Sequence, residues 1–265
     1  MTRPFKNEEI LEGGQVSTVY RSGDTVRRDV KDGSIHIHRL LKHLENKGFS
    51  CAPKFLGIDD QGREILSFIE GVAGSYPLKE YMWSDQVLRD IANMLQHYHD
   101  AVSDFPLKND WKPMDHTPNK IEVICHNDFA IYNIIFQDNK PAGIIDFDVA
   151  APGPRIWDIA YTLYTCVPLS RIYYKETGES VYYNPSTDAG RIKHRISLFF
   201  ESYGIESSKD VLEMVLIRLE ALCTYIKRKA GEGDIAFQKM IDQGQLEHYH
   251  KDIAFIREYG KEWIY

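Results

Sequence analysis

Cysteine is scarce in this sequence, and the few cysteines stand far apart. The 265 residues contain four, at positions 51, 125, 166 and 223, and no two of them form a C-x-x-C pair. Disulfide frameworks and zinc sites both rely on sets of cysteines at short, regular spacings. We therefore expect reduced, mostly buried thiols, with neither a disulfide framework nor a zinc site.

Long apolar runs and clusters of basic residues are also missing. No apolar run approaches the roughly 18 residues that span a bilayer, and the first residues, MTRPFKNEEI, lack the apolar core of a secretory signal. The net charge is −7 and Lys and Arg are dispersed, so no nucleic-acid-binding stripe is present. We expect a cytoplasmic protein without membrane or nucleic-acid partners, and an acidic protein suits a cationic small molecule.

The first part of the chain predicts a small sheet with one helix. Residues 8–30 alternate short strand-like runs with glycine turn signals, and residues 54–70 form two further strands around the turn Asp60-Gln61-Gly62. Between them, residues 34–47 have the apolar spacing of an amphipathic helix, with Ser34 as N-cap and Gly48 as its stop. An antiparallel sheet of about five strands is expected, and residues 71–77 would connect it to the rest.

The remainder predicts a larger, mainly helical lobe with short buried strands around residues 121–146. Helices are expected at residues 84–102, 159–166, 189–202, 209–229 and 234–259. The fold class is therefore α+β, with residues 1–71 as an N-terminal lobe and residues 72–265 as a C-terminal lobe.

Residues 124–158 carry the chemistry. They contain His126-x-Asp128-x4-Asn133, then Asp146 and Asp148 behind an apolar run, then Asp158. Phosphoryl transfer from a nucleotide needs one carboxylate that orients the attacking hydroxyl, and an Asn and a second carboxylate that hold magnesium against the phosphates. This spacing indicates a kinase.

Each of the first three residues has a predicted role. Asp128 is the expected catalytic base; the alternative is a loop Asp that caps a turn. Asn133 can turn its amide oxygen toward magnesium. His126, grouped with the catalytic residues, is expected to brace the loop by a hydrogen bond rather than to transfer protons.

The three later carboxylates differ in how far the sequence defines them. Asp146 follows a buried strand and is expected to reach the phosphates through magnesium. Asp148 has three open interpretations: a second metal ligand, a contact to a cationic substrate, or a turn cap. Asp158 is expected to be structural and to accept backbone N–H bonds from a helix start or from the catalytic loop.

The motifs HNDFAIYN, IIDFD and WDIAY, in this order, resemble the aminoglycoside phosphotransferase and choline kinase group of small-molecule kinases. The resemblance covers nearly the whole chain. It implies a bilobal fold similar to that of protein kinases, ATP or GTP as donor, and Mg2+. It also implies Asp128 as base, with Asn133 and Asp146 as metal ligands.

The N-terminal lobe departs from the kinase pattern. The expected phosphate loop, GGQVSTVY, offers Ser17 and Thr18 but lacks GxGxxG. Arg28 aligns with the strand lysine that contacts phosphates, and its alternative is a solvated strand arginine. The helix glutamate that would pair with this cation is missing, so the nucleobase is expected to bind to the connection near Ser67 and Ile69.

The acceptor is predicted to be a small-molecule hydroxyl compound that can carry positive charge. Six tyrosines between residues 161 and 183, together with Glu176 and Glu179, suit an aminated ligand, although tyrosines at such spacing are also typical of a core. Aminoglycosides, choline- or ethanolamine-type compounds and sugars all remain open. A kinase-like protein that binds without turnover is the rival hypothesis; a protein kinase is disfavoured, because no glycine follows Asp146-Phe147.

Overall fold

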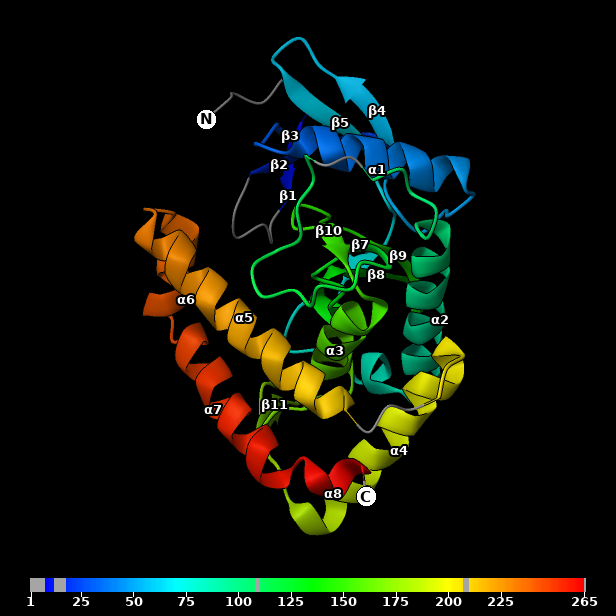
Figure 1. Ribbon diagram of the computed structural model, residues 1–265. Helices are drawn as coiled ribbons and strands as arrows, with labels where there is room; N and C mark the ends of the chain where they lie inside the picture. Colours follow the sequence, from blue (N-terminus) through cyan, green and yellow to red (C-terminus); the bar gives the residue numbers. More distant parts are fainter. Residues whose placement is uncertain (1–7, 12–17, 108–109, 207–209, 265) are drawn as a thin grey trace.

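A small sheet lies over a mainly helical part in the computed structural model, which describes residues 8–11, 18–107, 110–206 and 210–264 (Figure 1). The sheet has five antiparallel strands in the order β1-β2-β3-β5-β4. Its strands are β1 Glu9–Leu11, β2 Val19–Ser22, β3 Thr25–Asp29, β4 Phe55–Ile58 and β5 Arg63–Ser67. The predicted sheet is therefore confirmed.

One helix, α1 Ser34–Asn46, lies against this sheet, as the apolar spacing predicts. The expected cap was wrong: the N-cap is Gly33 in a left-handed conformation (φ 86°), and Ser34 is already helical. The hydroxyl of Ser34 accepts the backbone N–H of Lys31 at 2.9 Å, which orders the turn before the helix. Gly48, also left-handed at φ 75°, ends the helix as predicted.

The chain leaves the sheet along a segment that is packed tightly against the catalytic region. β6 Val72–Ala73 pairs with β8 Ile134–Gln137, which in turn pairs with β9 Lys140–Ile144. A Cβ at Gly71 would lie 2.4 Å from the carbonyl oxygen of Phe136, so only glycine allows this approach. The connection is thus fixed to the strand that follows the catalytic loop.

Helices form most of the rest, and three of the predicted helices differ from the structure by more than two residues. They are α2 Asp85–Ala101, α3 Arg155–Cys166, α4 Pro185–Tyr203, α5 Val211–Gly231, α6 Ile235–Asp242, α7 Gln245–Tyr259 and α8 Lys261–Ile264, with short 3-10 turns at η1 Glu80–Trp83 and η2 Ile131–Asn133. α3 and α4 each begin four residues earlier than expected, and the early start of α3 places Asp158 in its first turn. The single helix expected over 234–259 is interrupted by Gly244, whose φ of 78° turns the chain between α6 and α7.

The remaining strands form two short antiparallel pairs. β7 Val123–Cys125 pairs with β10 Ala151–Gly153, and β11 Ile172–Tyr174 pairs with β12 Ser180–Tyr182. All four cysteines are free thiols, three of them buried, as their spacing predicts. Within the described ranges, no helix is both long and apolar enough to cross a membrane.

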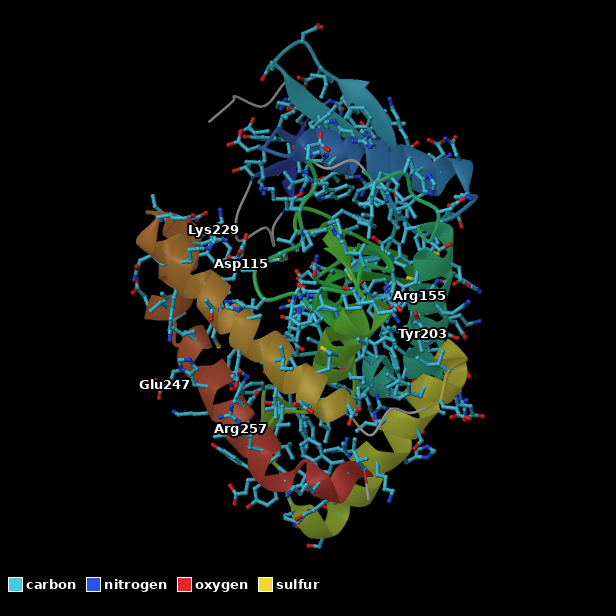
Figure 2. All side chains as sticks on the ribbon, viewed as in Figure 1. Asp115, Arg155, Tyr203, Lys229, Glu247 and Arg257 are labelled. Carbon is cyan, nitrogen blue, oxygen red and sulfur yellow. The ribbon has the colours of Figure 1, made fainter. Side chains whose placement is uncertain are left out.

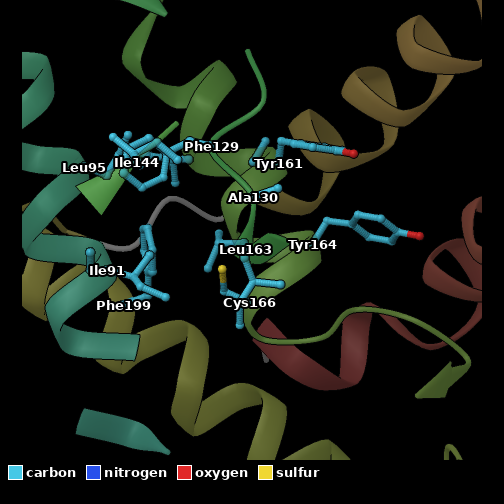
Figure 3. Close-up of a cluster of buried hydrophobic side chains, with 14 of the residues drawn as sticks. Ile91, Leu95, Phe129, Ala130, Ile144, Tyr161, Leu163, Tyr164, Cys166 and Phe199 are labelled. Atoms are coloured by element: carbon cyan, nitrogen blue, oxygen red, sulfur yellow. The ribbon is translucent and has the colours of Figure 1, made fainter. Parts of the chain in front are cut away.

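The main apolar cluster lies directly beneath the loop that carries Asp128. Ile91 and Leu95 from α2 meet Phe129, Ile144 and Phe199 in it, and all five are buried (Figure 3). The burial of such side chains is the main favourable term in folding. The loop is therefore supported by buried apolar side chains from α2, α4 and β9.

Candidate functional site

Asp128 lies in the loop between β7 and β8 and is held by two of its own neighbours. The hydroxyl of Tyr132 donates to Oδ1 at 2.6 Å, and Nδ2 of Asn133 donates to Oδ2 at 2.8 Å. Burial raises the pKa of Asp128 to about 6; the hydrogen bond from Tyr132 opposes this rise, while the charge of Asp146 adds to it. A carboxylate with this pKa is ionised at neutral pH and can still accept a proton, as a general base requires.

Asp158 holds the start of this loop from the first turn of α3. Its two carboxylate oxygens accept the backbone N–H groups of His126 and Asn127, each at 2.7 Å, and Nε2 of His99 lies 3.1 Å from Oδ2. Burial alone would raise the pKa of Asp158, but the hydrogen bond and charge of His99 and the nearby His126 hold it below its ordinary value. Asp158 is expected to accept backbone N–H bonds from a helix start or from the loop of Asp128, and the structure shows the bonds from the loop.

A second layer of contacts fixes His99 in turn. Its Nδ1 lies 2.6 Å from the hydroxyl of Tyr203 on α4, and Arg155 at the start of α3 lies 3.5 Å from the same hydroxyl (Figure 2). Arg155 also forms an ion pair with Asp100 at 2.7 Å. Helices α2, α3 and α4 therefore hold Asp158 jointly.

His126 is buried behind the loop. Its Nδ1 accepts the backbone N–H of Asp128 at 3.2 Å, and its ring lies 4.5 Å from that of Phe147. Burial lowers its pKa to about 4, so His126 is neutral at pH 7. These contacts support the predicted bracing role.

Arg218 on α5 also contacts the loop, and no sequence motif predicts this contact. It is 4 % exposed, donates to the backbone carbonyl of Asn127, and places its guanidinium 4.7 Å from the ring centroid of Tyr161. Asn127 itself adopts a left-handed conformation at φ 64°, which is strained for a residue other than glycine. Arg218 lies 91 residues further along the chain than Asn127, so no local motif connects them.

Asp146 and Asn133 offer oxygen atoms to the same side of the loop as Asp128. Asp146 has a left-handed φ of 65° and a half-exposed carboxylate, and its pKa is raised by burial and by the charge of Asp148. Nδ2 of Asn133 bonds to the backbone and side-chain oxygens of Asp128, which leaves its Oδ1 to face a cation. The backbone N–H of Ile145 donates to the carbonyl of Asn133 at 3.0 Å and fixes the two segments together.

These residues fit a magnesium ion that is bound mainly by phosphates. Mg2+ takes one or two protein oxygens together with phosphate oxygens and water. The described ranges contain no group of three or more His, Cys, Asp and Glu side chains that could hold a metal by themselves. One carboxylate and one amide oxygen agree with a metal site that a nucleotide completes.

Arg28 on β3 is not a solvated strand arginine. Its side chain is only 12 % exposed, donates to Glu64 and Asp148, and lies 3.9 Å from Asp146. Burial opposes its charge, but the three carboxylates together raise its pKa. The guanidinium is therefore a fixed positive charge beside the carboxylates of Asp146 and Asp148.

Asp148 uses both carboxylate oxygens on cations of the N-terminal part. Oδ1 accepts from Arg28 and Oδ2 accepts from Lys31 at 2.6 Å. Their positive charges outweigh the effect of burial and lower its pKa. Metal ligation by Asp148 stays a prediction. It would require an oxygen that already accepts from Arg28 or Lys31 to bind the metal as well.

The residues expected to contact the nucleotide are placed only in part. Ser17 lies outside the described residues, and Thr18 is exposed just before β2. The backbone N–H of Ser67 donates to the carbonyl of Lys54 at 2.9 Å. The hydroxyl of Ser67 accepts the backbone N–H of Lys54 at 2.8 Å. Ile69 makes no backbone hydrogen bond to any residue of the described ranges, so its N–H and C=O can meet a nucleobase.

The six tyrosines of the acceptor prediction do not gather in one place. Tyr161 and Tyr164 on α3 direct their hydroxyls away from the apolar cluster to the same side, and Tyr161 bonds to Tyr132 at 2.9 Å (Figure 3). The other four belong to the β11–β12 hairpin or pack around it: Tyr173, Tyr174, Tyr182 and Tyr183. Glu176 accepts the backbone N–H of Glu80, and Glu179 accepts from the side chain of Lys175. Tyr161 reaches Asp128 through Tyr132, whereas the hydroxyl of Tyr164 donates to Asp252 on α7 at 2.7 Å.

Comparisons with known proteins agree with this arrangement. Residues 107–186 match the phosphotransferase enzyme family. A trifolitoxin immunity protein from Rhizobium leguminosarum bv. trifolii is 33% identical over 211 residues, which is 75% of each protein.

Solved structures with a similar fold include three kinases. An amicoumacin kinase in complex with AMP-PNP and Ca2+ has a TM-score of 0.62 at 13% identity, over 94% of this chain and 88% of that one. A choline kinase from Cryptosporidium parvum Iowa II has a TM-score of 0.60 at 13% identity, over 96% and 90%. A GDP complex of aminoglycoside 2'-phosphotransferase-IIIa has a TM-score of 0.61 at 15% identity, over 95% and 93%.

At such identities these structures establish the kinase-like fold, while the sequence matches establish the relationship. The chain therefore belongs to the phosphotransferase enzyme family of small-molecule kinases, the group that includes the aminoglycoside phosphotransferases and choline kinases.

Proposed function

We propose that this phosphotransferase transfers the terminal phosphoryl group of ATP or GTP to a hydroxyl of a small molecule, with Asp128 as the catalytic base. The observation that carries the proposal is the set of contacts around Asp128. Tyr132 and Asn133 hold its carboxylate, and its pKa of about 6 suits proton transfer near neutral pH.

Asp128 orients the acceptor hydroxyl and accepts its proton as the oxygen bonds to phosphorus. The hydrogen bonds from Tyr132 and Asn133 fix the direction of the carboxylate before the acceptor arrives. Such preorganisation avoids the cost of reorienting the base during the reaction. Asp158 supports the geometry from behind through the backbone of His126 and Asn127.

Asn133 and Asp146 would hold the metal, and Arg28 would neutralise phosphate charge beside it. Magnesium, when bound with the nucleotide, neutralises charge on the transferring group. The free Oδ1 of Asn133 and the half-exposed Asp146 carboxylate are the oxygens that fit it. The nucleobase would bind to the backbone of Ile69.

The acceptor is proposed to be an antimicrobial or amino-alcohol compound, aminoglycoside-like or otherwise cationic, with a free hydroxyl. The related proteins are named for trifolitoxin, amicoumacin, aminoglycosides and choline. The half-buried Tyr132 beside Asp128 supplies an aromatic ring that can contact a cation.

A nucleotide-consumption assay tests the proposal. Purified protein is incubated with ATP or GTP, with and without Mg2+, and with trifolitoxin, amicoumacin, kanamycin, choline or a simple sugar. We expect acceptor-dependent consumption that requires the metal, and a mass increase of one phosphoryl group on one acceptor.

Asp146→Asn should abolish the Mg2+-dependent turnover, because it removes the charge of a proposed metal ligand. Asp138→Asn, in the exposed turn between β8 and β9, is the matched control and should behave as wild type. Nucleotide binding without phosphorylation of any acceptor would favour the binding-only hypothesis. Unchanged metal dependence in Asp146→Asn would refute its assignment as a ligand.

A further inference from the structure

The pairing of Arg28 differs from the kinase pattern in where its carboxylate comes from. In that pattern a helix glutamate orients the strand cation. The only glutamate of α1, Glu45, forms an exposed ion pair with Lys54 at 2.9 Å and points away from Arg28. A different residue must therefore orient the guanidinium.

Glu64 on β5 is placed to do so. The register of β3 and β5 sets Arg28 directly opposite Glu64, so their side chains leave the same face of the sheet. Nε of Arg28 donates to Oε1 of Glu64, and the glutamate is 1 % exposed. A buried carboxylate with this partner holds the guanidinium in one orientation.

The helix still contributes, through a histidine. Nε2 of His38 on α1 lies 2.6 Å from Oε2 of Glu64, and its ring is stacked on Phe55 at 3.8 Å between centroids. The two oxygens of Glu64 are thus shared between the helix and the strand. His38 connects α1 to Arg28 across Glu64.

We propose that Glu64 is the positioning residue for Arg28 in nucleotide binding, and that His38 fixes Glu64 from helix α1. Together they replace the missing helix glutamate. Arg28 has one guanidinium edge on Glu64 and directs the rest toward Asp146 and Asp148, where the phosphates would lie. The proposal rests on the proposed nucleotide-dependent function, and it concerns the donor side only.

A double-mutant cycle on nucleotide affinity tests it. The dissociation constant of fluorescent ADP in the presence of Mg2+ is measured for wild type, Glu64→Gln, Arg28→Gln and the double variant. Because Glu64→Gln removes the negative charge that strengthens the hydrogen bond from Arg28, we expect it to weaken binding by about tenfold. In the Arg28→Gln background the same change should cost less than about twofold, whereas independent sites would give the same loss in both backgrounds to within about twofold.

Two further variants separate positioning from general damage. Glu45→Gln removes the glutamate of α1 that does not contact Arg28, and should leave affinity unchanged. His38→Gln can still donate to Glu64, so it should retain most of the affinity, whereas His38→Ala should weaken it. Melting temperatures are recorded for all variants, and His38→Ala reports on the same contact if Glu64→Gln does not fold.

The outcomes distinguish this inference from the proposed function. Equal losses from Glu64→Gln with and without Arg28 would overturn the positioning role and leave the kinase function intact. Unchanged affinity in Glu64→Gln would do the same. Failure of the wild-type protein to bind any nucleotide would reject both.

Discussion

The loop that carries Asp128 and the side chain of Arg28 are held in different ways. The loop residues are close in sequence and are fixed by hydrogen bonds to one buried carboxylate, Asp158. Arg28 is fixed by partners from β5 and from the segment after β9, which lie 36 and 120 residues away. The loop is therefore held from the helical part, by Asp158 on α3 and Arg218 on α5, while the donor side depends on the register of the sheet.

The largest effect is expected where the loop presents its base. Asp128→Asn preserves size and loses the proton acceptor, so the turnover rate should fall at least about 100-fold, the usual contribution of a general base. Nucleotide affinity should stay within about twofold, because Arg28 and Asp146 are unchanged. Turnover and fluorescent nucleotide titration measure the two quantities.

Asp138→Asn is the control for this change, since it makes the same substitution in an exposed turn. Asp128→Asn with wild-type turnover would remove Asp128 from the mechanism. A large loss of nucleotide affinity would show instead that the loop and the donor side are not separable.

The next effect concerns the stability of the loop. Asp158→Asn leaves at least one buried backbone N–H facing an amide NH2 group, so the free energy of unfolding should fall by about 3 kcal/mol, as when a buried ionic contact is broken. Chemical denaturation measures this loss. Asp60→Asn, in the exposed turn between β4 and β5, is the control and should change little.

The same residue predicts a pH dependence of stability. The pKa of Asp158 is depressed in the folded protein, so its ionised form stabilises the fold at pH values above about 4, the unfolded value. This stabilisation is lost as the pH falls through the lower folded pKa. Asp158→Asn should lack that component, and an acid-unfolding curve with the same slope as wild type would contradict the assignment.

The third effect is a shift in the pH profile. Since Asp128 must be ionised and its pKa is about 6, kcat/KM should fall about tenfold per pH unit below that value. The hydrogen bond from Tyr132 lowers this pKa, so Tyr132→Phe should move the acidic limb to higher pH. Tyr182→Phe, at a residue that is 67 % exposed, should leave the profile unchanged. A limb that stays in place in Tyr132→Phe would mean that another group controls it.

The loop was predictable from sequence because its chemistry lies within 35 residues. The spacing of Asp128, Asn133 and Asp146 is a local pattern, and the apolar runs around it indicate the strands that fix it. Helix α1 was also predictable, because its apolar spacing lies within one short segment. The missed details, the cap at Gly33 and the break at Gly244, depend on single left-handed residues that apolar periodicity does not register.

The donor side was predictable only in part, because sheet register is a long-range property. Arg28 was chosen by its place on a strand, but nothing local indicates that Glu64 stands opposite to it. Arg218 was missed for a related reason, since a helix far along the chain brings it to Asn127. Sequence motifs identify the reacting groups more readily than the groups that position them.

The smallest effect distinguishes the two cations that share Asp148. Lys31 is 35 % exposed and Arg28 only 12 %, and partly exposed ion pairs contribute about 0.2–1 kcal/mol. Lys31→Gln should therefore weaken nucleotide binding less than about fivefold, and Arg28→Gln should weaken it more, because Arg28 is also held by Glu64. Both are measured by nucleotide titration at two salt concentrations, and screening should reduce the Lys31 effect more. If Lys31→Gln costs as much as Arg28→Gln, the cation that faces the phosphates is Lys31, and Asp148 rather than Glu64 is the carboxylate that positions it.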